Sequence, residues 1–258
     1  AVASAAARMR YAAGDRYLAE MGARRANEYA AVAAARAAYI VGFDSTSNLE
    51  AGRSWGVPTM GTSAHSFTLL HDSETEAFRS QIESMGAETT LLVDTYEIEP
   101  AVREAVRLTD GKIAAVRIDS GDLSMAASKV RHLLDSLGAN ETKIVVTSDL
   151  DEYTIAALAA APVDRYGVGT SLVTGSGHPT VGFVYKLVAH SDRDGWVDVA
   201  KTSPSKANRG GKKFASRKIE DSIATAELVG GDSQGRPLQV QLVEDGKCSS
   251  SAMGPEGV

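Results

Sequence analysis

The sequence has only one cysteine, Cys248, and few aromatic residues, which make up 6% of its 258 positions. A single thiol cannot form a disulfide within the chain, and it lacks the second cysteine that the common zinc motifs require. No apolar run approaches the roughly 18–20 residues of a membrane-spanning helix. We therefore expect neither a disulfide-stabilised domain nor a membrane protein, and we predict a cytoplasmic chain.

Positive charge is also in short supply. The chain carries 27 Lys and Arg residues against 33 Asp and Glu residues, which gives a formal net charge of −6 at pH 7. Proteins whose main partner is a nucleic acid usually present a strongly basic surface. The charge balance therefore argues against nucleic acid as a partner.

Up to about residue 190, short apolar segments alternate with helical ones. Strands separated by helices of 10–15 residues indicate βαβ units and a parallel sheet, and an α/β barrel fits this length as a single domain. We predict strands at 16–21, 89–93, 113–117, 143–147 and 163–168, and helices over the Ala-rich amino terminus and at 26–40, 99–109, 123–137 and 151–160.

The remaining quarter of the chain has a different texture. Residues 191–246 mix short apolar runs with Gly, Asp and Ser, which predicts a small antiparallel β unit. Strands are expected at 183–189, 196–201, 213–217, 225–228 and 238–243. Residues 247–258 have the composition of a frayed tail. The predicted organisation is an α/β domain at 1–190, a β-rich unit at 191–246 and a tail at 247–258.

Polar residues follow the predicted strands of the α/β domain. In parallel α/β folds, ligands bind at the carboxyl ends of the strands, so these residues are expected to share one active site. They are Asp94, Arg117, Asp119, Ser120, Gly121, Ser148, Asp149, Gly167, Gly169 and Thr170.

The segment AVRIDSGDL contains the most specific of these clusters. Arg117 and Asp119 flank Ile118, so their side chains point to the same face of the strand end. An arginine there can bind a carboxylate or phosphate through two parallel hydrogen bonds, and the acids can hold ribose hydroxyls or Mg²⁺. An Arg–Asp ion pair with a purely structural role is the alternative, and the neighbouring polar clusters favour function.

Two further segments are weaker signals. YGVGTSLVTGSG, at 166–177, is a glycine-rich loop after a strand, where backbone amides and the Thr170 hydroxyl could bind phosphate. It matches neither a Walker loop nor a dinucleotide fingerprint. His65 lies between small residues in GTSAHSF, where it could act as an acid, a base or a phosphoryl acceptor. Taken alone, a histidine that begins a helix and packs on Phe67 is the simpler interpretation.

Eight segments in order together resemble the nicotinate phosphoribosyltransferase family. They are MGARRA (21–26), GFDSTSNLEAG (42–52), GTSAHSF (61–67), LLVDTYE (91–97), VRIDSGDL (116–123), TSDLDEY (147–153), YGVGTSLVT (166–174) and VYKLV (184–188). The resemblance runs from residue 1 to about 217. It implies an irregular TIM-like α/β barrel with a small β-rich unit, and a homodimer with shared active sites.

The resemblance also implies a reaction. Nicotinate and phosphoribosyl pyrophosphate would give nicotinate mononucleotide and pyrophosphate in NAD salvage, with Mg²⁺ as cofactor and ATP as co-substrate. ATP hydrolysis would be coupled through a phosphohistidine, which falls on His65. Asp94 and Asp119 would serve ribose or Mg²⁺, and Thr62 and Arg117 would contact nicotinate.

The resemblance assigns the remaining ligand-binding positions as well. Arg24 and Arg25 are expected to face phosphates, and Gly169 and Thr170 to form the phosphoribosyl phosphate loop. Ser47, with Asn48, occupies the position where the related nicotinamide enzymes hold an aspartate, which favours nicotinate over nicotinamide.

Two departures from the family leave alternatives open. The family's N-terminal domain has no counterpart here, and the final segment, CSSSAMGPEGV, matches no segment of the family. An inactive fragment or a non-catalytic interaction subunit is therefore one alternative to an enzyme. A nicotinamide or quinolinate phosphoribosyltransferase on the same scaffold is the other. The basic stretch 201–218 resembles a family loop, with Arg209 or Gly210 where proline is often found. A solvated basic hairpin is at least as good an interpretation of it as a nucleotide contact.

Overall fold

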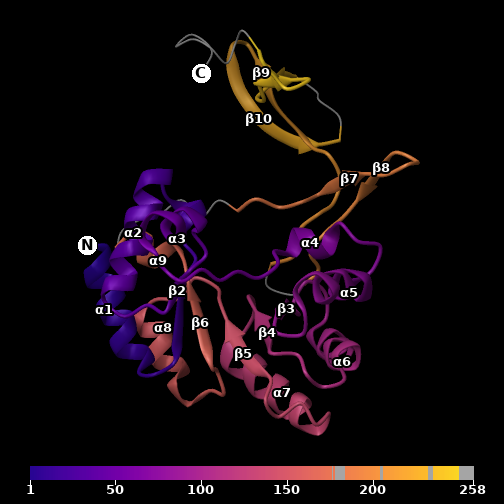
Figure 1. The fold of residues 1–258 in the computed structure, drawn as a ribbon. Helices are drawn as coiled ribbons and strands as arrows, with labels where there is room; N and C mark the ends of the chain where they lie inside the picture. Colours follow the sequence, from indigo (N-terminus) through magenta and orange to yellow (C-terminus); the bar gives the residue numbers. More distant parts are fainter. Residues whose placement is uncertain (176, 178–183, 204–205, 232–234, 250–258) are drawn as a thin grey trace. The chain divides into compact units, whose positions relative to one another are not determined.

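The computed structural model describes residues 1–175, 177, 184–203, 206–231 and 235–249 (Figure 1). Phe183, with which one predicted strand begins, and positions 250–258 of the predicted tail lie outside these residues. The chain forms two compact units. The first comprises Ala1–Lys186 together with Lys201–Asn208, and the second comprises Leu187–Ala200 and Arg209–Val258. The segment 201–208 therefore belongs with the α/β unit rather than with the β-rich residues that surround it in sequence.

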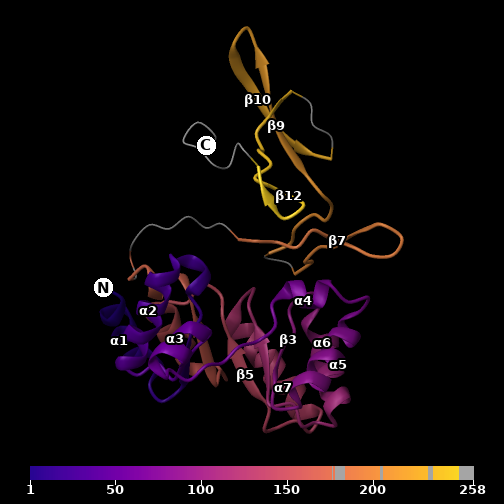
Figure 2. The ribbon, with the colours of Figure 1, turned by 45° about the horizontal axis from the view of Figure 1, so that its top comes forward.

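The first unit contains a six-stranded sheet in the order β2-β1-β6-β5-β4-β3, and every neighbouring pair is parallel. The sheet curls, and β2 and β3 are its edges (Figures 1 and 2). Its strands are β1 Tyr17–Glu20, β2 Ser45–Thr46, β3 Thr90–Leu92, β4 Ala115–Ile118, β5 Lys143–Val146 and β6 Arg165–Val168. The parallel sheet confirms the predicted α/β class, and because all six strands run the same way, their carboxyl ends share one edge.

The helices of this unit lie beside the sheet and also pack against one another, for example α1 against α8 and α6 against α7. They are α1 Val2–Ala13, η1 Ala23–Arg25, α2 Glu28–Ile40, α3 Leu49–Trp55, α4 His65–Leu69, α5 Glu74–Met85, α6 Ile98–Thr109, α7 Leu123–Ser136, α8 Glu152–Ala157, η2 Leu158–Ala160 and α9 Thr170–Val173. The sequence analysis found none of β2, α3 and α5 as elements. It gave a helix beginning at His65, where α4 starts, as the simpler interpretation of that residue.

Side-chain caps set where several helices begin. Asn27, Asn48, Ser73, Asp122 and Asp151 each accept a hydrogen bond from a backbone N–H in the first turn. Such caps satisfy amide groups that have no partner within the helix. The cap predicted at Asp151 is confirmed, and the helix after it is shorter than predicted because it tightens into η2.

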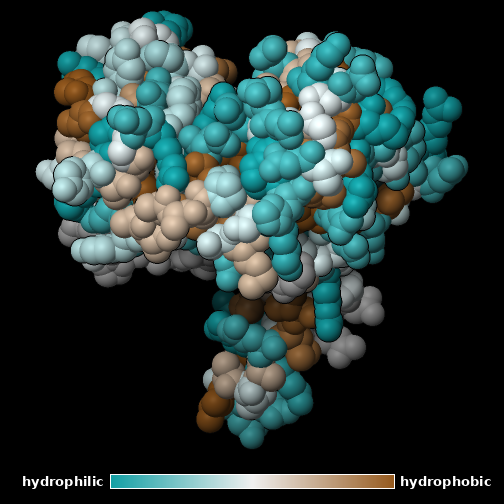
Figure 3. Space-filling model, turned by 90° about the horizontal axis from the view of Figure 1, so that it is seen from below, coloured by the Kyte–Doolittle hydropathy of each residue, from teal (hydrophilic) through white to brown (hydrophobic). Residues whose placement is uncertain are grey.

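Helix α6 shows how the sequence directs burial. Its buried residues are Ala101, Val102, Ala105, Val106 and Thr109, which recur on one face at helical spacing. Strands β3 and β6 are buried almost throughout, as expected where a parallel sheet is covered by helices. On the face drawn in Figure 3, hydrophilic residues predominate and hydrophobic ones form scattered patches. Among the described residues, no helix is both long enough and apolar enough to cross a lipid bilayer.

The second unit is built of short antiparallel strands. They are β7 Ala189–Ser191, β8 Trp196–Asp198, β9 Phe214–Glu220, β10 Ile223–Gly230, β11 Arg236–Pro237, β12 Val243–Glu244 and β13 Lys247–Cys248. They pair as β7-β8, β10-β9-β11 and β12-β13, all antiparallel.

Two predicted strands in this region are wrong. Residues 184–188 form no strand, and β7 begins only at Ala189, although the alternation VYKLV is typical of one. Residues 238–242 also lie outside strands. There the side chain of Gln239 accepts a hydrogen bond from Ala215 N–H at 3.0 Å, so a side chain occupies a backbone donor of β9. The ladder between β11 and β9 accordingly ends at Pro237.

Candidate active site

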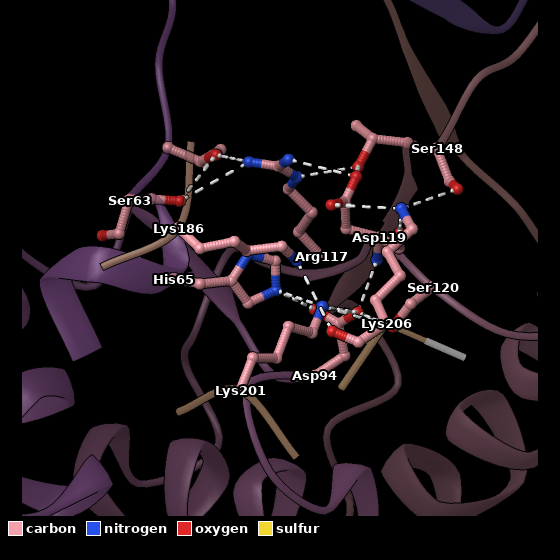
Figure 4. Close-up of polar contacts among 12 residues, drawn as sticks. Ser63, His65, Asp94, Arg117, Asp119, Ser120, Ser148, Lys186, Lys201 and Lys206 are labelled. Carbon is pink, nitrogen blue, oxygen red and sulfur yellow. Dashed lines mark hydrogen bonds and ion pairs between the residues drawn. The ribbon is translucent and has the colours of Figure 1, made fainter. Parts of the chain in front are cut away.

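The carboxyl ends of β3, β4 and β5 carry the polar residues that the sequence analysis singled out. Asp94 follows β3, Asp119 and Ser120 follow β4, and Ser148 follows β5. Figure 4 shows these side chains pointing toward one another, together with His65 at the start of α4 and two lysines from the segment 201–208. The structure therefore brings together the side chains at the ends of these three adjacent strands.

Asp94 lies at the centre of this cluster, with only 1% of the residue exposed. His65 Nε2 lies 3.0 Å from its Oδ1, and the backbone N–H of Asp119 donates to its Oδ2 at 3.2 Å. The Ser120 hydroxyl also donates to Oδ2. Lys201 Nζ lies 3.4 Å from the same oxygen and 2.8 Å from His65 Nε2. One buried carboxylate thus positions a histidine, a serine and a lysine.

Burial and charge oppose each other in this cluster. Burial alone would raise the pKa of Asp94, but hydrogen bonds from His65 and Ser120 and the positive charge of Lys201 outweigh it and hold the pKa well below its ordinary value. Burial lowers the pKa of Lys201, against the opposing effect of Asp94 and Asp119. Both side chains are at most 2% exposed, so they form a buried ion pair, and removing either partner would leave an uncompensated charge.

Arg117 occupies the middle of the same edge. Its Nε donates to the Thr147 hydroxyl at 3.0 Å, one Nη donates to the Thr62 hydroxyl, and the other lies 3.4 Å from Asp119 Oδ1. This confirms that Arg117 and Asp119 share a face, and it brings Thr62 into the site as predicted. Nη1 also lies 3.5 Å from the Ser63 carbonyl, and the Arg117 side chain is 14% exposed, so the guanidinium is held in one orientation with a small part of the side chain open to solvent.

Asp119 is held among cations. Burial would raise its pKa, but the charge of Arg117, the hydrogen bond from Thr147 and the charge of Lys206 outweigh it and lower the pKa. Lys206 Nζ donates to the carbonyl of Asp119 and to Ser148 Oγ at 3.0 Å. Ser148 and Asp149 have φ angles of 101° and 41°, in the left-handed region that non-glycine residues rarely adopt. This strained turn after β5 coincides with the predicted site.

The other predicted residues lie at the ends of β6, β1 and β2, on the same edge of the sheet. Arg24 and Arg25 form η1 after β1 and line a cavity of about 650 Å³ with Asn27, Tyr185 and Lys186. Ser47 is exposed after β2. The oxygen of Asn48 caps α3 by accepting from Ala51 N–H, a structural role that the sequence analysis did not assign.

Gly167, within β6, and Gly169, directly after it, are closely packed against other protein atoms. A Cβ on Gly167 would lie 2.6 Å from Thr147 Cγ2 and 2.7 Å from Met21 Sδ, and one on Gly169 would lie 3.2 Å from the Met21 carbonyl oxygen. Thr170 opens α9 directly after them. Gly121, with a φ of 84°, makes the turn after β4. Because Gly167 belongs to the strand, the glycine-rich loop begins only after Val168.

Lys201, Lys206 and Glu20 belong to the site region and were missed. For its first residues, the interpretation of 201–218 as a solvated hairpin is wrong, because Lys201 is buried against Asp94. The simpler interpretation of His65 had its ring packing on Phe67. The histidine ring beside Phe67 is instead that of His71, and the two ring centroids lie 4.7 Å apart. Glu20 ends β1 as a fully buried acid, and the strand-end rule applied to the predicted strand 16–21 would have found it.

The described residues contain no group of three or more His, Cys, Asp and Glu side chains arranged to hold a metal ion. Asp94 suits a metal poorly, since His65, Ser120 and Lys201 already occupy its two oxygens. Asp119 is likewise neutralised by Arg117 and Lys206. Mg²⁺ prefers one or two carboxylates together with substrate phosphates, so these residues do not form a resident metal site by themselves.

Comparison with known proteins identifies the family. The model of the nicotinate phosphoribosyltransferase (NAPRTase) family matches residues 17–228, which is most of the chain and includes every residue of the Asp94 cluster. The chain belongs to the nicotinate phosphoribosyltransferase family.

Relatives in this family are similar to the chain over most of its length. A nicotinate phosphoribosyltransferase of Mycobacterium tuberculosis is 54% identical over 246 residues, covering 92% of this chain and 54% of the relative. One of Bacillus subtilis is 40% identical over 232 residues, covering 86% of this chain and 47% of the relative. The chain thus spans about half the length of the curated relatives it matches.

Solved structures agree on the fold of the nicotinate phosphoribosyltransferase family. A nicotinate phosphoribosyltransferase of Porphyromonas gingivalis superposes with a TM-score of 0.70 at 21% identity, covering 81% of this chain and 59% of that one. A nicotinate-nucleotide pyrophosphorylase of Pyrococcus furiosus gives 0.63 at 23% identity, covering 96% of this chain and 64% of that one. At these identities the likeness shows a shared fold.

Glu74, in the first turn of α5, lies near this family site without belonging to the network. Burial, together with the negative charges of Asp94 and Glu104, raises its pKa to about 7. Among the described residues, its buried Oε1 has no hydrogen-bond partner. Between about pH 4.5 and 7 the folded chain therefore binds more protons at Glu74 than the unfolded chain does, so stability falls as pH rises through this window.

We expect Glu74→Gln to weaken this pH dependence. The wild-type urea midpoint should fall between pH 5 and pH 8, and the variant's midpoint should fall less, because glutamine does not ionise. Glu76→Gln, in the same helical turn but exposed, is the matched control and should behave as wild type. Parallel curves for wild type and Glu74→Gln would show that Glu74 is not a buried proton-binding group.

Proposed function

We propose that this chain carries the catalytic half of a nicotinate phosphoribosyltransferase. The reaction joins nicotinate to phosphoribosyl pyrophosphate and gives nicotinate mononucleotide and pyrophosphate, as a step of NAD salvage. The observation that carries the proposal is the placement of Arg117, a fixed and partly open anion-binding group, beside the His65–Asp94–Lys201 network on one edge of the sheet. Family membership and the names of the relatives support it.

The remaining half of the family protein is needed for full activity in this proposal. The open edges of the sheet, β2 and β3, would then lie in an irregular TIM-like barrel, and active sites would be shared between the subunits of a homodimer. Experiments on turnover therefore use what we call the completed protein, in which residues 1–258 are joined to the portion of the Mycobacterium tuberculosis relative that this chain does not cover.

The chemistry asks mainly for positioning. The lone pair of the pyridine nitrogen forms a bond to C1 of the ribose while the C1–oxygen bond to pyrophosphate breaks, and the electron pair leaves with pyrophosphate. No general base is required, because the nitrogen carries no proton. The sugar becomes cationic in the transition state, so fixed carboxylates such as Asp119 stabilise it where the geometry brings them near.

The nicotinate carboxylate is proposed to pair with Arg117. The contacts from Thr147, Thr62 and Asp119 hold the guanidinium in one orientation, so its remaining N–H groups are fixed before the ligand arrives. A fixed fork loses less conformational entropy on binding than a mobile one. Thr62 would lie beside the same carboxylate.

The phosphates of phosphoribosyl pyrophosphate are proposed to lie toward β6 and β1. Arg24, Arg25 and Lys186 supply positive charge around the cavity there. In this proposal Mg²⁺ arrives on the pyrophosphate of the substrate, where it would neutralise the leaving group.

His65 is proposed to accept a phosphoryl group from ATP, with ADP leaving. Asp94 and Lys201 both contact Nε2 of His65, so these contacts fix the ring. The other ring nitrogen, Nδ1, is left to accept the phosphoryl group. Hydrolysis of the phosphohistidine would return phosphate and free histidine, which couples ATP to product formation.

Arg117→Ala in the completed protein is expected to raise the KM for nicotinate. A hydrogen bond to a charged group contributes about 1.5–3 kcal/mol, so the rise should be roughly tenfold or more, and Arg117→Lys should be impaired less. Arg103→Ala, on the exposed face of α6, is the control and should change nothing. An unchanged KM in both Arg117 variants would remove this residue from the base site.

Ser47→Asp is expected to lower the preference for nicotinate over nicotinamide. A carboxylate about 4 Å from the nicotinate carboxylate would repel it by on the order of 4 kcal/mol before relaxation, whereas a serine hydroxyl can donate to it. Nicotinamide should gain little, because Arg117 still favours an anion. The ratio of kcat/KM for the two bases measures this, with Ser136→Asp at the exposed end of α7 as control. A constant ratio would place Ser47 away from the base.

His65→Ala is expected to abolish the acid-labile phosphate that ATP leaves on the completed protein, while slow ATP-independent transfer remains. The measurement is incorporation of label from γ-labelled ATP, compared with nicotinate mononucleotide formed without ATP. His132→Ala, an exposed histidine on α7, should label as wild type. Acid-labile label on His65→Ala would show that the phosphoryl group goes elsewhere.

A further inference from the structure

A second buried carboxylate organises the other end of the sheet edge. Glu20 is the last residue of β1 and is 0% exposed, and no step of the proposed reaction uses it. Its Oε1 accepts a hydrogen bond from the backbone N–H of Gly22, and its Oε2 accepts one from the hydroxyl of Thr46. A buried acid in such a place needs partners that compensate its desolvation, and here they come from two different loops.

Hydrogen bonds extend from Glu20 into both loops. On one side, Gly22 accepts through its carbonyl from Arg25 N–H at 2.8 Å, inside the turn that carries Arg24 and Arg25. On the other side, Thr46 Oγ1 accepts from Asn48 N–H at 3.0 Å. The Glu20 carbonyl also accepts from Ser47 N–H at 2.8 Å. The same residue thus contacts the arginine turn after β1 and the Ser47–Asn48 turn after β2.

The packing around Gly22 adds the loop after β6. A Cβ on Gly22 would lie 2.2 Å from Val173 Cγ1, 2.9 Å from Glu20 Oε1 and 3.0 Å from the Gly169 carbonyl oxygen. Gly22 is therefore wedged between Glu20 and the glycine loop, and only a residue without a side chain fits. In addition, Met21 N–H donates to the Val168 carbonyl at 2.7 Å.

We propose that Glu20 is a positioning residue that couples the turn carrying Arg24 and Arg25 to the turn carrying Ser47 and Asn48. The functional consequence of this inference rests on the proposed function. A change at the Ser47–Asn48 turn, assigned to the base, should alter ligand binding at the Arg24–Arg25 turn, assigned to the phosphates. Burial raises the pKa of Glu20, while the hydrogen bonds from Thr46 and Gly22 oppose that rise. The charged form of Glu20 is therefore stabilised by a hydrogen bond from Gly22 and one from Thr46, and loss of either bond should affect the carboxylate and its contact with the other.

Amide hydrogen exchange of the 258-residue chain tests the coupling directly. Thr46→Val removes the hydroxyl that links Glu20 to the second turn. We expect exchange to accelerate about tenfold at 46–52 and also at 22–27, in line with the loss of a hydrogen bond to a charged group. Thr142→Val is the matched control. It removes an equally buried hydroxyl, which donates to the Ile113 carbonyl near the amino ends of β4 and β5. Both turns should then exchange as in wild type.

A conservative variant separates a specific link from general damage. Glu20→Gln keeps an oxygen for Gly22 N–H and can donate its amide to Thr46 Oγ1, so exchange should stay close to wild type. Glu20→Ala removes both contacts, and both turns should exchange faster. If Thr46→Val accelerates exchange only at 46–52, or if Glu20→Gln is as disruptive as Glu20→Ala, the coupling is refuted.

Ligand binding distinguishes this inference from the proposed function. The affinity of the chain for phosphoribosyl pyrophosphate is measured by calorimetry. The affinity should fall about tenfold in Thr46→Val, although Thr46 directly precedes the turn assigned to the base, and it should be unchanged in Thr142→Val. Coupled exchange with unaltered affinity would uphold the link through Glu20 and overturn the placement of the phosphates at Arg24 and Arg25.

Discussion

The buried pair of Asp94 and Lys201 is the interaction on which the rest of the site depends. Both side chains are buried away from solvent, so moving either one would leave the other as a buried charge without its ion-pair partner. This constraint fixes Lys201 against the end of β3, more than 100 residues away in sequence. The same pair also holds His65, whose Nε2 contacts Asp94 Oδ1 and Lys201 Nζ. Since Asp94 also binds the backbone of Asp119, the pair sets the position of the strand that carries Arg117.

The parallel sheet gives this site its second half. Because every strand points the same way, the ends of β6, β1 and β2 lie on the same edge as those of β3, β4 and β5. A buried acid organises each half, Asp94 in one and Glu20 in the other. The proposed division of labour follows this geometry, with base and phosphoryl chemistry near Asp94 and the phosphates of the sugar near Arg24 and Arg25.

Much of this arrangement could be predicted from the sequence, because strand periodicity is local and strand ends are marked by polar residues. Asp94, Arg117 and Asp119 were found in that way. Lys201 and Lys206 were not, since their burial depends on tertiary contacts with Asp94 and Asp119 that no local pattern reports. The two-residue strand β2 is too short to show a period. Residues 238–242 have a strand-like pattern, yet there the Gln239 side chain takes a backbone donor of β9.

The most direct test measures nicotinate mononucleotide and pyrophosphate formed by the completed protein from nicotinate and phosphoribosyl pyrophosphate, with wild type and Asp94→Asn compared. The account predicts equal amounts of the two products from wild type. It predicts a rate lower by about a hundredfold in Asp94→Asn, because Lys201 and His65 lose the charge that holds them. Absence of product from a folded wild-type protein, or an undiminished rate in Asp94→Asn, would contradict it.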